Sequence, residues 1–296
     1  MTPKTEDLAA LRGQIDEIDD QIHDLLMRRS RVVEEVAQFK SGDAPVIRPG
    51  REAQILRRIL GRHQGRLAPQ VVARIWREIL AGATEMQGPF AVAAYAPEGQ
   101  FRLWDVCREH YGAYTQILPT SDPVHAIRMV IEGVAQVGMV PWPNDRAADP
   151  WWACLVGDSD RLPQIVARLP FVADARSTDV QTLAIARVAS EPTGDDHSFL
   201  VLELQETISR SRLMQTLTAE GFKPVAFWTY SDDAHGEVIQ HLVEVEGFLD
   251  RHDPRLATTK QAFGEALQRI VYLGGFAMPI VVPAPADTAA SRRNGA

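Results

Sequence analysis

The chain has 296 residues, of which 45% are hydrophobic and 24% are charged, a composition typical of globular proteins and long enough for two or three small domains. Its formal net charge of −8 argues against nucleic-acid partners, because a surface that binds phosphates carries a basic excess. No apolar run approaches the roughly 20 residues needed to span a bilayer, and the N-terminus lacks the apolar core of a signal peptide. We therefore expect a cytoplasmic protein without a membrane partner. No metal site is predicted, because the two cysteines have no CxxC spacing.

A long amphipathic helix is predicted from about residue 6 to residue 40. Apolar residues recur along one stripe at spacings of three and four, namely at Leu8, Leu11, Ile15, Ile18, Ile22 and Leu25 and on through Val32, Val33 and Val36. At 1.5 Å per residue, such a helix is on the order of 50 Å long. Two shorter helices cannot cover that length, so we expect the stripe to meet a second copy of itself in a homodimer.

Two shorter helices follow the long one. The residues from Ser41 to Pro45 favour turns and break the helical pattern. A second helix is predicted from Pro49 to Gly61, and a third from Pro69 to Gln87. Three helices, the first much the longest, therefore fill a first domain over residues 6–87.

After Gly88 the pattern changes to short apolar strands that alternate with helical stretches, which predicts an α/β domain over residues 90–190. Residues 197–280 then read as strand, helix, strand, strand, helix and strand, with the second of these helices placed at Lys260–Ile270. This βαββαβ order is the ferredoxin-like arrangement, which small regulatory domains often use. The tail over residues 283–296 is rich in Ala, Pro and Arg and is predicted to be disordered. The predicted fold class is thus multidomain: all-α, then α/β, then ferredoxin-like.

Two cations share the spacing of the apolar stripe on the first helix. Arg29 and Lys40 stand four, three and four residues apart with Val33 and Val36, so both lie on or beside a face that should be buried. A buried cation is costly without an anionic partner. Either both cations extend their charged ends to water or pair with Glu34, Glu35 or Glu52, or they bind a small molecule with two carboxylates.

The run LAALRGQIDEIDDQIHDLLMRRSRVVEEVAQFK, followed by RE at residues 51–52 and by Gln87 near the end of the third helix, resembles the all-helical class of chorismate mutase throughout residues 8–87. The resemblance implies an interlocked dimer in which long helices cross between subunits and each active site lies among helices. It implies an isomerase of the shikimate pathway that converts chorismate to prephenate for aromatic amino acid biosynthesis. Since a Claisen rearrangement needs neither a nucleophile nor a proton transfer, no cofactor is expected.

The resemblance also implies roles for individual side chains. Arg29 binds one substrate carboxylate, and Arg12, reaching over from the partner subunit, binds the other. Lys40 and Gln87 donate hydrogen bonds to the ether oxygen, where negative charge grows as the bond breaks. Lys40, Gln87 and Glu52 are accordingly the predicted catalytic residues.

The remaining predicted site residues follow the family pattern less closely. Arg51 and Glu52 fix the ring hydroxyl and balance the charge around Lys40. Arg48 occupies a position at which the family often has an acidic residue, and Ala83 stands where a serine hydroxyl commonly helps to bind a carboxylate. One substrate contact is therefore expected to be missing, or to come from a backbone donor.

The downstream order resembles bifunctional proteins that join chorismate mutase to prephenate dehydratase and an ACT regulatory domain. AYAPEGQF at residues 94–101 and VGMVPWPND at residues 137–145 resemble two dehydratase segments, but only Thr182 remains of a threonine, arginine and phenylalanine triplet. Leu183 replaces the arginine, and about 100 residues are half of what a two-lobed dehydratase needs. We expect a degenerate lobe and an ACT-like unit in which phenylalanine sensing is doubtful.

Three functions remain open at this stage. The first is a chorismate mutase whose remaining chain is vestigial, and the second is a bifunctional mutase and dehydratase. The third is a non-catalytic regulatory partner of an aromatic-pathway enzyme. The intact set of Arg12, Arg29, Lys40 and Gln87 argues against the third, because a binding module has no reason to keep these side chains together.

Overall fold

The computed structural model describes residues 5–39, 46–144, 150–157, 159, 161–173, 180–205, 208–231 and 238–283. Lys40 and the predicted tail beyond Pro283 lie outside these residues. The helices are α1 (Thr5–Gln38), α2 (Pro49–Gly61), α3 (Pro69–Glu85), α4 (Phe101–Tyr111), α5 (Pro123–Ile131), α6 (Arg210–Ala219) and α7 (Pro254–Phe263), with two 3-10 turns, η1 (Trp151–Leu155) and η2 (Gly264–Ala266). The strands are β1 (Ala91–Tyr95), β2 (Gln116–Thr120), β3 (Val137–Pro141), β4 (Gln164–Leu169), β5 (Val172–Ala173), β6 (Thr182–Ala186), β7 (Asp196–Leu204), β8 (Pro224–Ser231), β9 (Ile239–Glu246), β10 (Leu267–Ala277) and β11 (Ile280–Val281).

This order confirms the predicted fold class: three helices, then an α/β part, then the sequence β7-α6-β8-β9-α7-β10. The helix predicted at Lys260–Ile270 is present but lies earlier, at Pro254–Phe263, so its predicted bounds are wrong. Asp253 caps the N-terminus of α7 by accepting a hydrogen bond from the Arg255 backbone nitrogen, and Gly264, with φ +60°, follows the last residue of the helix. The strand β10 then begins at Leu267.

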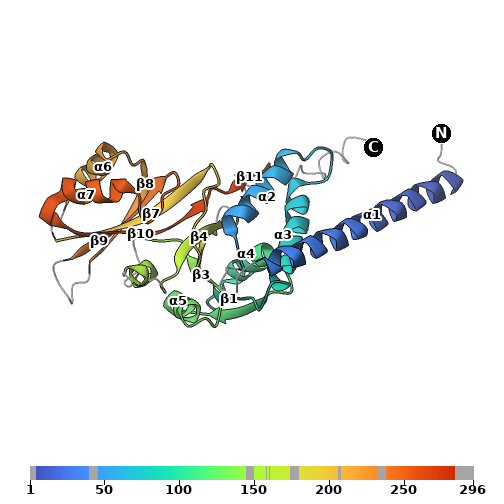
Figure 1. Ribbon diagram of the computed structural model, residues 1–296, viewed down its shortest axis with the longest axis horizontal. Helices are drawn as coiled ribbons and strands as arrows, with labels where there is room; N and C mark the ends of the chain where they lie inside the picture. Colours follow the sequence, from blue (N-terminus) through green and yellow to red (C-terminus); the bar gives the residue numbers. More distant parts are fainter. Residues whose placement is uncertain are drawn as a thin grey trace, which may run out of the picture.

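The α/β part and the ferredoxin-like part share one sheet of nine strands, in the order β2-β1-β3-β6-β4-β10-β7-β9-β8. The first part is mixed, since β1, β2 and β3 are parallel while β6 runs antiparallel to both neighbours. The second part, β10-β7-β9-β8, is antiparallel throughout. The two parts join where β10 pairs with β4, and Figure 1 shows them side by side along the long axis of the molecule.

Gly274 makes this junction possible. It faces Ile165 of β4 and has φ +124°, a region that side chains other than glycine rarely adopt. A Cβ atom at this position would lie 2.2 Å from the Ile165 carbonyl oxygen. The backbones of β10 and β4 can therefore approach only because residue 274 has no side chain.

The helices α2 and α3 do not form a separate core. Ile47, Leu56 and Leu80 are buried in the same cluster as Val92 of β1 and Met139 of β3. This face of the sheet also carries α4, while α5 and η1 cover the opposite face and α6 and α7 cover the ferredoxin-like part. The second and third helices are thus a layer on the sheet.

Polar contacts hold the same layer in place. Arg57 of α2 donates to the carbonyl oxygens of Thr193, Asp195 and Met278 at 3.2, 2.7 and 2.9 Å. Its guanidinium also donates to the Thr193 hydroxyl at 2.7 Å. One arginine therefore ties α2 to the segment before β7 and to the end of β10.

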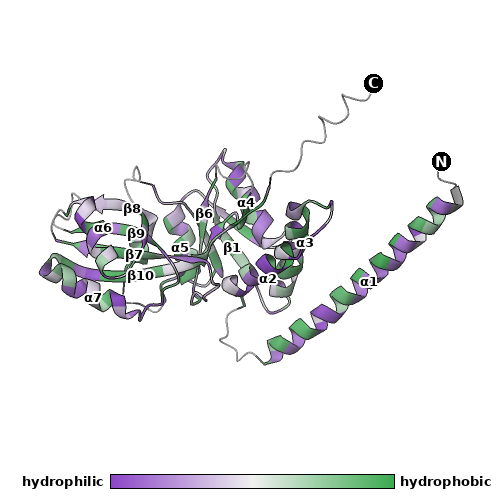
Figure 2. Cartoon of the chain, turned by 90° about the horizontal axis from the view of Figure 1, so that it is seen from above, coloured by the Kyte–Doolittle hydropathy of each residue, from purple (hydrophilic) through white to green (hydrophobic). Residues whose placement is uncertain are grey.

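The first helix lies apart from this layer. Figures 1 and 2 both show α1 extending away from the rest of the chain, and it makes no extensive contact with another described element. Its apolar stripe is exposed, as the large side chains of Leu8, Leu11, Ile15, Ile18, Ile22, Leu25, Val32 and Val36 show. In the part of the chain that the structure describes, no helix combines the length and the apolar character that crossing a membrane requires.

Candidate functional site

Two predicted site residues lie on α1. Arg12 is exposed, while Arg29 is half-buried, and this burial lowers the pKa of its guanidinium. The two arginines stand 17 positions apart, which corresponds to about 25 Å along a helix. One small dicarboxylate cannot reach both within a single chain.

A third predicted residue, Glu52 of α2, lies in an ion pair that the sequence did not predict. Arg77 of α3 donates through Nη1 to Glu52 Oε2 at 2.9 Å, and their side chains are 6% and 20% exposed. Burial raises the pKa of the Glu52 carboxyl, and the Arg77 guanidinium opposes that rise. The guanidinium also lies 5.5 Å from the centre of the Phe171 ring, after β4.

The signal for Arg77 was present in the sequence. Ala73, Arg77, Leu80 and Thr84 follow the spacing of four, three and four that marks one helix face, and all four are buried. A cation on such a face needs an anionic partner. The reasoning that marks Arg29 on α1 therefore also marks Arg77 on α3.

The other predicted residues of α2 face different surroundings. Arg48, at the N-cap of α2, donates to Glu191 Oε1 through Nη2 at 2.5 Å and through Nε at 3.1 Å, so it joins α2 to the segment after β6. Arg51 is exposed. Arg48 therefore forms an ion pair with Glu191 of the same chain.

Two more predicted residues lie together at the end of α3. Gln87 donates through Nε2 to the Ala83 carbonyl oxygen at 2.8 Å, so these are the two residues that lie together.

Thr182, the residue predicted as a remnant of the dehydratase site, is at the start of β6. It lies between Pro141 and Leu169 of the neighbouring strands and is 1% exposed. Its hydroxyl oxygen has no hydrogen-bond partner among the described residues.

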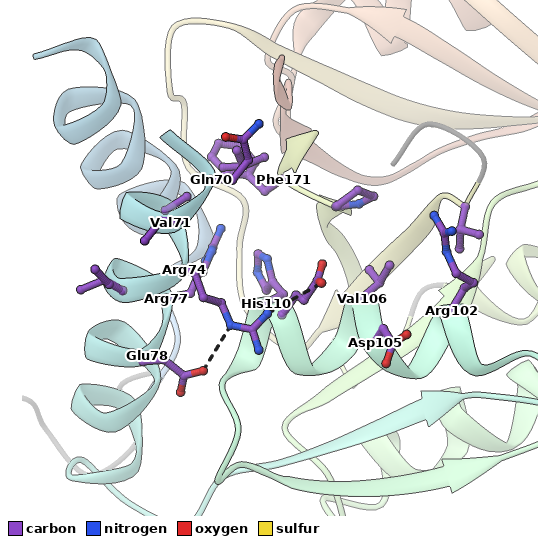
Figure 3. A pocket seen from close by; sticks show the side chains of 16 residues that line it. Gln70, Val71, Arg74, Arg77, Glu78, Arg102, Asp105, Val106, His110 and Phe171 are labelled. Atoms are coloured by element: carbon purple, nitrogen blue, oxygen red, sulfur yellow. Dashed lines mark ion pairs between the residues drawn. The ribbon is translucent and has the colours of Figure 1, made fainter. Parts of the chain in front are cut away.

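A cavity of about 690 Å³ opens between α3 and α4, beside the segment that joins β4 to β5 (Figure 3). Apart from Arg77, the polar side chains around it belong to residues outside the predicted set, namely Gln70, Arg74, Glu78, Arg102, Asp105, Glu109 and His110. Burial lowers the pKa of His110 well below its usual value, so this imidazole is neutral at pH 7. Within the described ranges, no three His, Cys, Asp or Glu side chains cluster in a way that could hold a metal ion.

The first part of the chain matches a known protein family. Residues 11–88 match the family described as chorismate mutase type II. This stretch contains α2, α3 and nearly all of α1. The match agrees with the resemblance found in the helical run and in the RE pair.

Similar curated proteins carry two activities in their names. A bifunctional chorismate mutase/prephenate dehydratase of Stutzerimonas stutzeri is 33% identical over 147 residues, which cover 48% of this chain and 40% of that protein. The protein of the same name from Pseudomonas aeruginosa is 34% identical over 145 residues, covering 47% and 40%. The matched stretch thus spans about two fifths of the length of these relatives.

Solved structures resemble the chain more distantly. A prephenate dehydratase of Arthrobacter aurescens in complex with L-Phe has a TM-score of 0.46 and 14% identity, over 68% of this chain and 96% of that one. A quorum-quenching acylase, GqqA, has a TM-score of 0.46 and 17% identity, over 70% and 100%.

Proposed function

We propose that the protein is a chorismate mutase that converts chorismate to prephenate in the cytoplasm, as a step of aromatic amino acid biosynthesis. The observation that carries this proposal is the family match over residues 11–88 together with the retained side chains Arg12, Arg29, Lys40, Arg51 and Gln87. These groups are cations and one amide, which suits a substrate with two carboxylates and an ether oxygen that gains charge.

The proposed mechanism relies on position and charge. Arg29 and the Arg12 of a second copy hold the two carboxylates, so that the substrate keeps the compact conformer from which the rearrangement starts. Lys40 and Gln87 donate to the ether oxygen, whose negative charge grows in the transition state. Arg77 already holds Glu52 Oε2, so we assign the other carboxylate oxygen, Oε1, to the ring hydroxyl.

A homodimer is part of this proposal, because one chain cannot bring Arg12 near Arg29. The midpoint between the two arginines falls between Asp20 and Gln21, close to the middle of α1. Antiparallel pairing of two α1 helices about that midpoint places the Arg12 of one copy beside the Arg29 of the other. The same pairing covers the exposed apolar stripe along its whole length.

The second candidate is a bifunctional mutase and dehydratase, favoured by the names of the relatives. The third, a non-catalytic regulatory partner, has only the separation of Arg12 from Arg29 within one chain in its favour. An assay of the purified chain that measures prephenate and phenylpyruvate separately distinguishes all three. We expect prephenate to form from chorismate, and a chain that forms neither product contradicts the proposal.

A matched pair of variants sharpens this assay. Arg29→Ala should lower kcat/KM by at least about a hundredfold, because a desolvated charge pair is commonly worth about 2–5 kcal/mol. Arg31→Ala removes an exposed cation two residues away on the same helix and should change little. Equal effects of the two substitutions would contradict the assignment of Arg29 to a carboxylate.

A further inference from the structure

The cavity between α3 and α4 has the size and the walls of a small-molecule site. Its volume of about 690 Å³ lies within the range of about 300–1,000 Å³ that ligand pockets commonly occupy. Three elements form it, namely the consecutive helices α3 and α4 and the segment around Phe171, which lies farther along the chain. Figure 3 shows charged and apolar side chains from these elements facing the same space.

Two polar groups in the cavity can form further hydrogen bonds. The Arg74 guanidinium has its described acidic partners, Glu78 and Glu109, at 3.5 and 3.7 Å, which is too long for strong charge-assisted hydrogen bonds. Gln70 donates through Nε2 to the Pro283 carbonyl oxygen at 2.9 Å, but its Oε1 is buried and has no partner among the described residues. A buried acceptor of this kind is satisfied by a donor from a ligand or from water.

Apolar side chains also line the cavity. Phe171, Val71 and Ile75 line the same space as Gln70 and Arg74. Val172 and Val180 line it as well. Val71 and Ile75 are 45% and 46% exposed, so a flat apolar group placed here would remove both from water.

The charges around the cavity alternate in sign. Three arginines, Arg74, Arg77 and Arg102, face three acidic residues, Glu78, Asp105 and Glu109, while His110 is neutral. A simple anion would meet the carboxylates, and a simple cation would meet the guanidinium groups. A ligand that carries one charge of each sign satisfies both sets.

We propose that this cavity binds a free α-amino acid with an aromatic side chain. The ligand carboxylate meets Arg74, its ammonium group donates to Gln70 Oε1 and to Glu109, and its ring lies against Phe171. Gln70, Arg74 and Glu109, the polar residues that contact the ligand, have no assigned part in the mutase reaction, although Arg77, which holds Glu52, also lines the cavity.

Calorimetric titration of the full-length protein tests the ligand class. L-phenylalanine, L-tyrosine and L-tryptophan serve as probes, and at least one of them should bind with a Kd of about 1 mM or tighter. Three analogues of phenylalanine each lack one group: 3-phenylpropionate has no ammonium, phenethylamine has no carboxylate and L-alanine has no ring. Each should bind at least about tenfold more weakly. Absence of saturable binding for all three amino acids, or equal binding of an analogue, would overturn the proposal.

A matched pair of variants tests the place. Arg74→Gln should weaken binding by about tenfold or more; its side chain is 47% exposed, so the fold should tolerate the change, which circular dichroism verifies. Arg66→Gln removes an exposed arginine that does not line the cavity and should leave the affinity unchanged. Unchanged binding in Arg74→Gln would place the ligand elsewhere in the molecule and overturn the site. Calorimetry measures binding without turnover, so its result is independent of any mutase assay.

Discussion

Arg77 of α3 donates to Glu52 of α2 across 2.9 Å, in a position where both side chains are largely withdrawn from water. The pair also contacts the sheet part of the chain, because the Arg77 guanidinium lies near the ring of Phe171, which follows β4. Glu52, the carboxylate predicted to be catalytic, is therefore fixed by a residue that is itself packed on the sheet part of the chain. The helical part and the sheet part are linked at this point.

Arg77→Met should strongly destabilise the protein. Removal of one partner leaves the Glu52 carboxylate buried without its counter-charge, which commonly costs about 3–5 kcal/mol. The free energy of unfolding, measured by urea titration, reports this loss. Arg58→Met, which changes an exposed arginine on α2, is the control and should be within about 0.5 kcal/mol of the parent chain. Adding Glu52→Gln to Arg77→Met should restore part of the stability, because no charge then remains buried.

The destabilisation by Arg77→Met should depend on pH. Burial already raises the pKa of Glu52, and loss of the opposing guanidinium raises it further in the folded state. A carboxyl whose folded-state pKa is raised favours folding below its unfolded-state pKa, and that contribution is lost as the pH rises through the folded-state pKa. The deficit relative to the parent chain should therefore be smaller at about pH 5 than at about pH 8. A deficit that does not change with pH would mean that Glu52 is not the group left uncompensated.

Mixing two inactive variants should restore mutase activity if each site combines two subunits. In a dimer of an Arg12→Ala chain with an Arg29→Ala chain, one site keeps both arginines and the other site loses both. Half of a random mixture forms such dimers, so co-refolding equal amounts should recover about a quarter of the parental activity. Each variant refolded alone is the control. Activity that stays at the level of the separate variants would indicate that both arginines act within one chain, or that Arg12 has no part in the site.

Lys40→Ala should act mainly on kcat. The ether oxygen gains its charge only in the transition state, so a donor aimed at it contributes little to binding of the ground state. Steady-state kinetics with chorismate separate the two parameters. Lys223→Ala removes an exposed lysine that pairs with Glu246 on the ferredoxin-like part and should change neither. A change confined to KM would assign Lys40 to ground-state binding instead.

Gly274→Ala should be among the most destabilising single substitutions in the chain. The added Cβ atom would meet the Ile165 carbonyl oxygen at 2.2 Å, in a backbone conformation with φ +124°. We expect a loss of at least about 3 kcal/mol, measured by urea unfolding. Gly61→Ala is the matched control, because nothing lies within 4 Å of its added Cβ atom. A mild effect at residue 274 would mean that the β4–β10 junction can relax.

The sequence predicted the elements whose cause is local. The stripe from Leu8 to Val36 predicted α1, and the βαββαβ order was confirmed from Phe199 onward. The last helix was misplaced because its limits depend on the Asp253 cap and on Gly264 more than on apolar spacing. The continuous sheet could not be predicted, because it depends on the pairing of Gly274 with Ile165, which are far apart along the chain.

The contacts of the predicted site residues could not be predicted from the sequence. The resemblance selected Glu52, yet its partner Arg77 stands 25 positions away and meets it only because α2 and α3 pack side by side. Arg48 was assigned to substrate, and the structure places it on Glu191, which is 143 positions away. The cavity between α3 and α4 depends on three elements that meet in space, so no local pattern indicates it.

The final prediction is that the protein forms prephenate but does not dehydrate it at neutral pH. Loss of hydroxide and carbon dioxide from prephenate needs a donor for the leaving hydroxyl and a cationic anchor for the carboxylate. Leu183 and Ala184 stand where the resemblance places the arginine and the phenylalanine of the triplet, and both are fully buried within the sheet. They can supply neither group.

Phenylpyruvate, detected under alkali beside the mutase assay, provides the measurement. Thr182 keeps a buried hydroxyl without a described partner, so prephenate binding without turnover agrees with the prediction. The substitution Leu183→Arg restores the arginine of the triplet and serves as a control. It puts a cation where a fully buried leucine now lies in the sheet. We therefore expect it to unfold the chain and not to create dehydratase activity. Dehydratase turnover within about tenfold of the mutase rate would contradict the prediction, because a difference that small, about 1.4 kcal/mol, would require positioned groups that the residues around Thr182 do not provide.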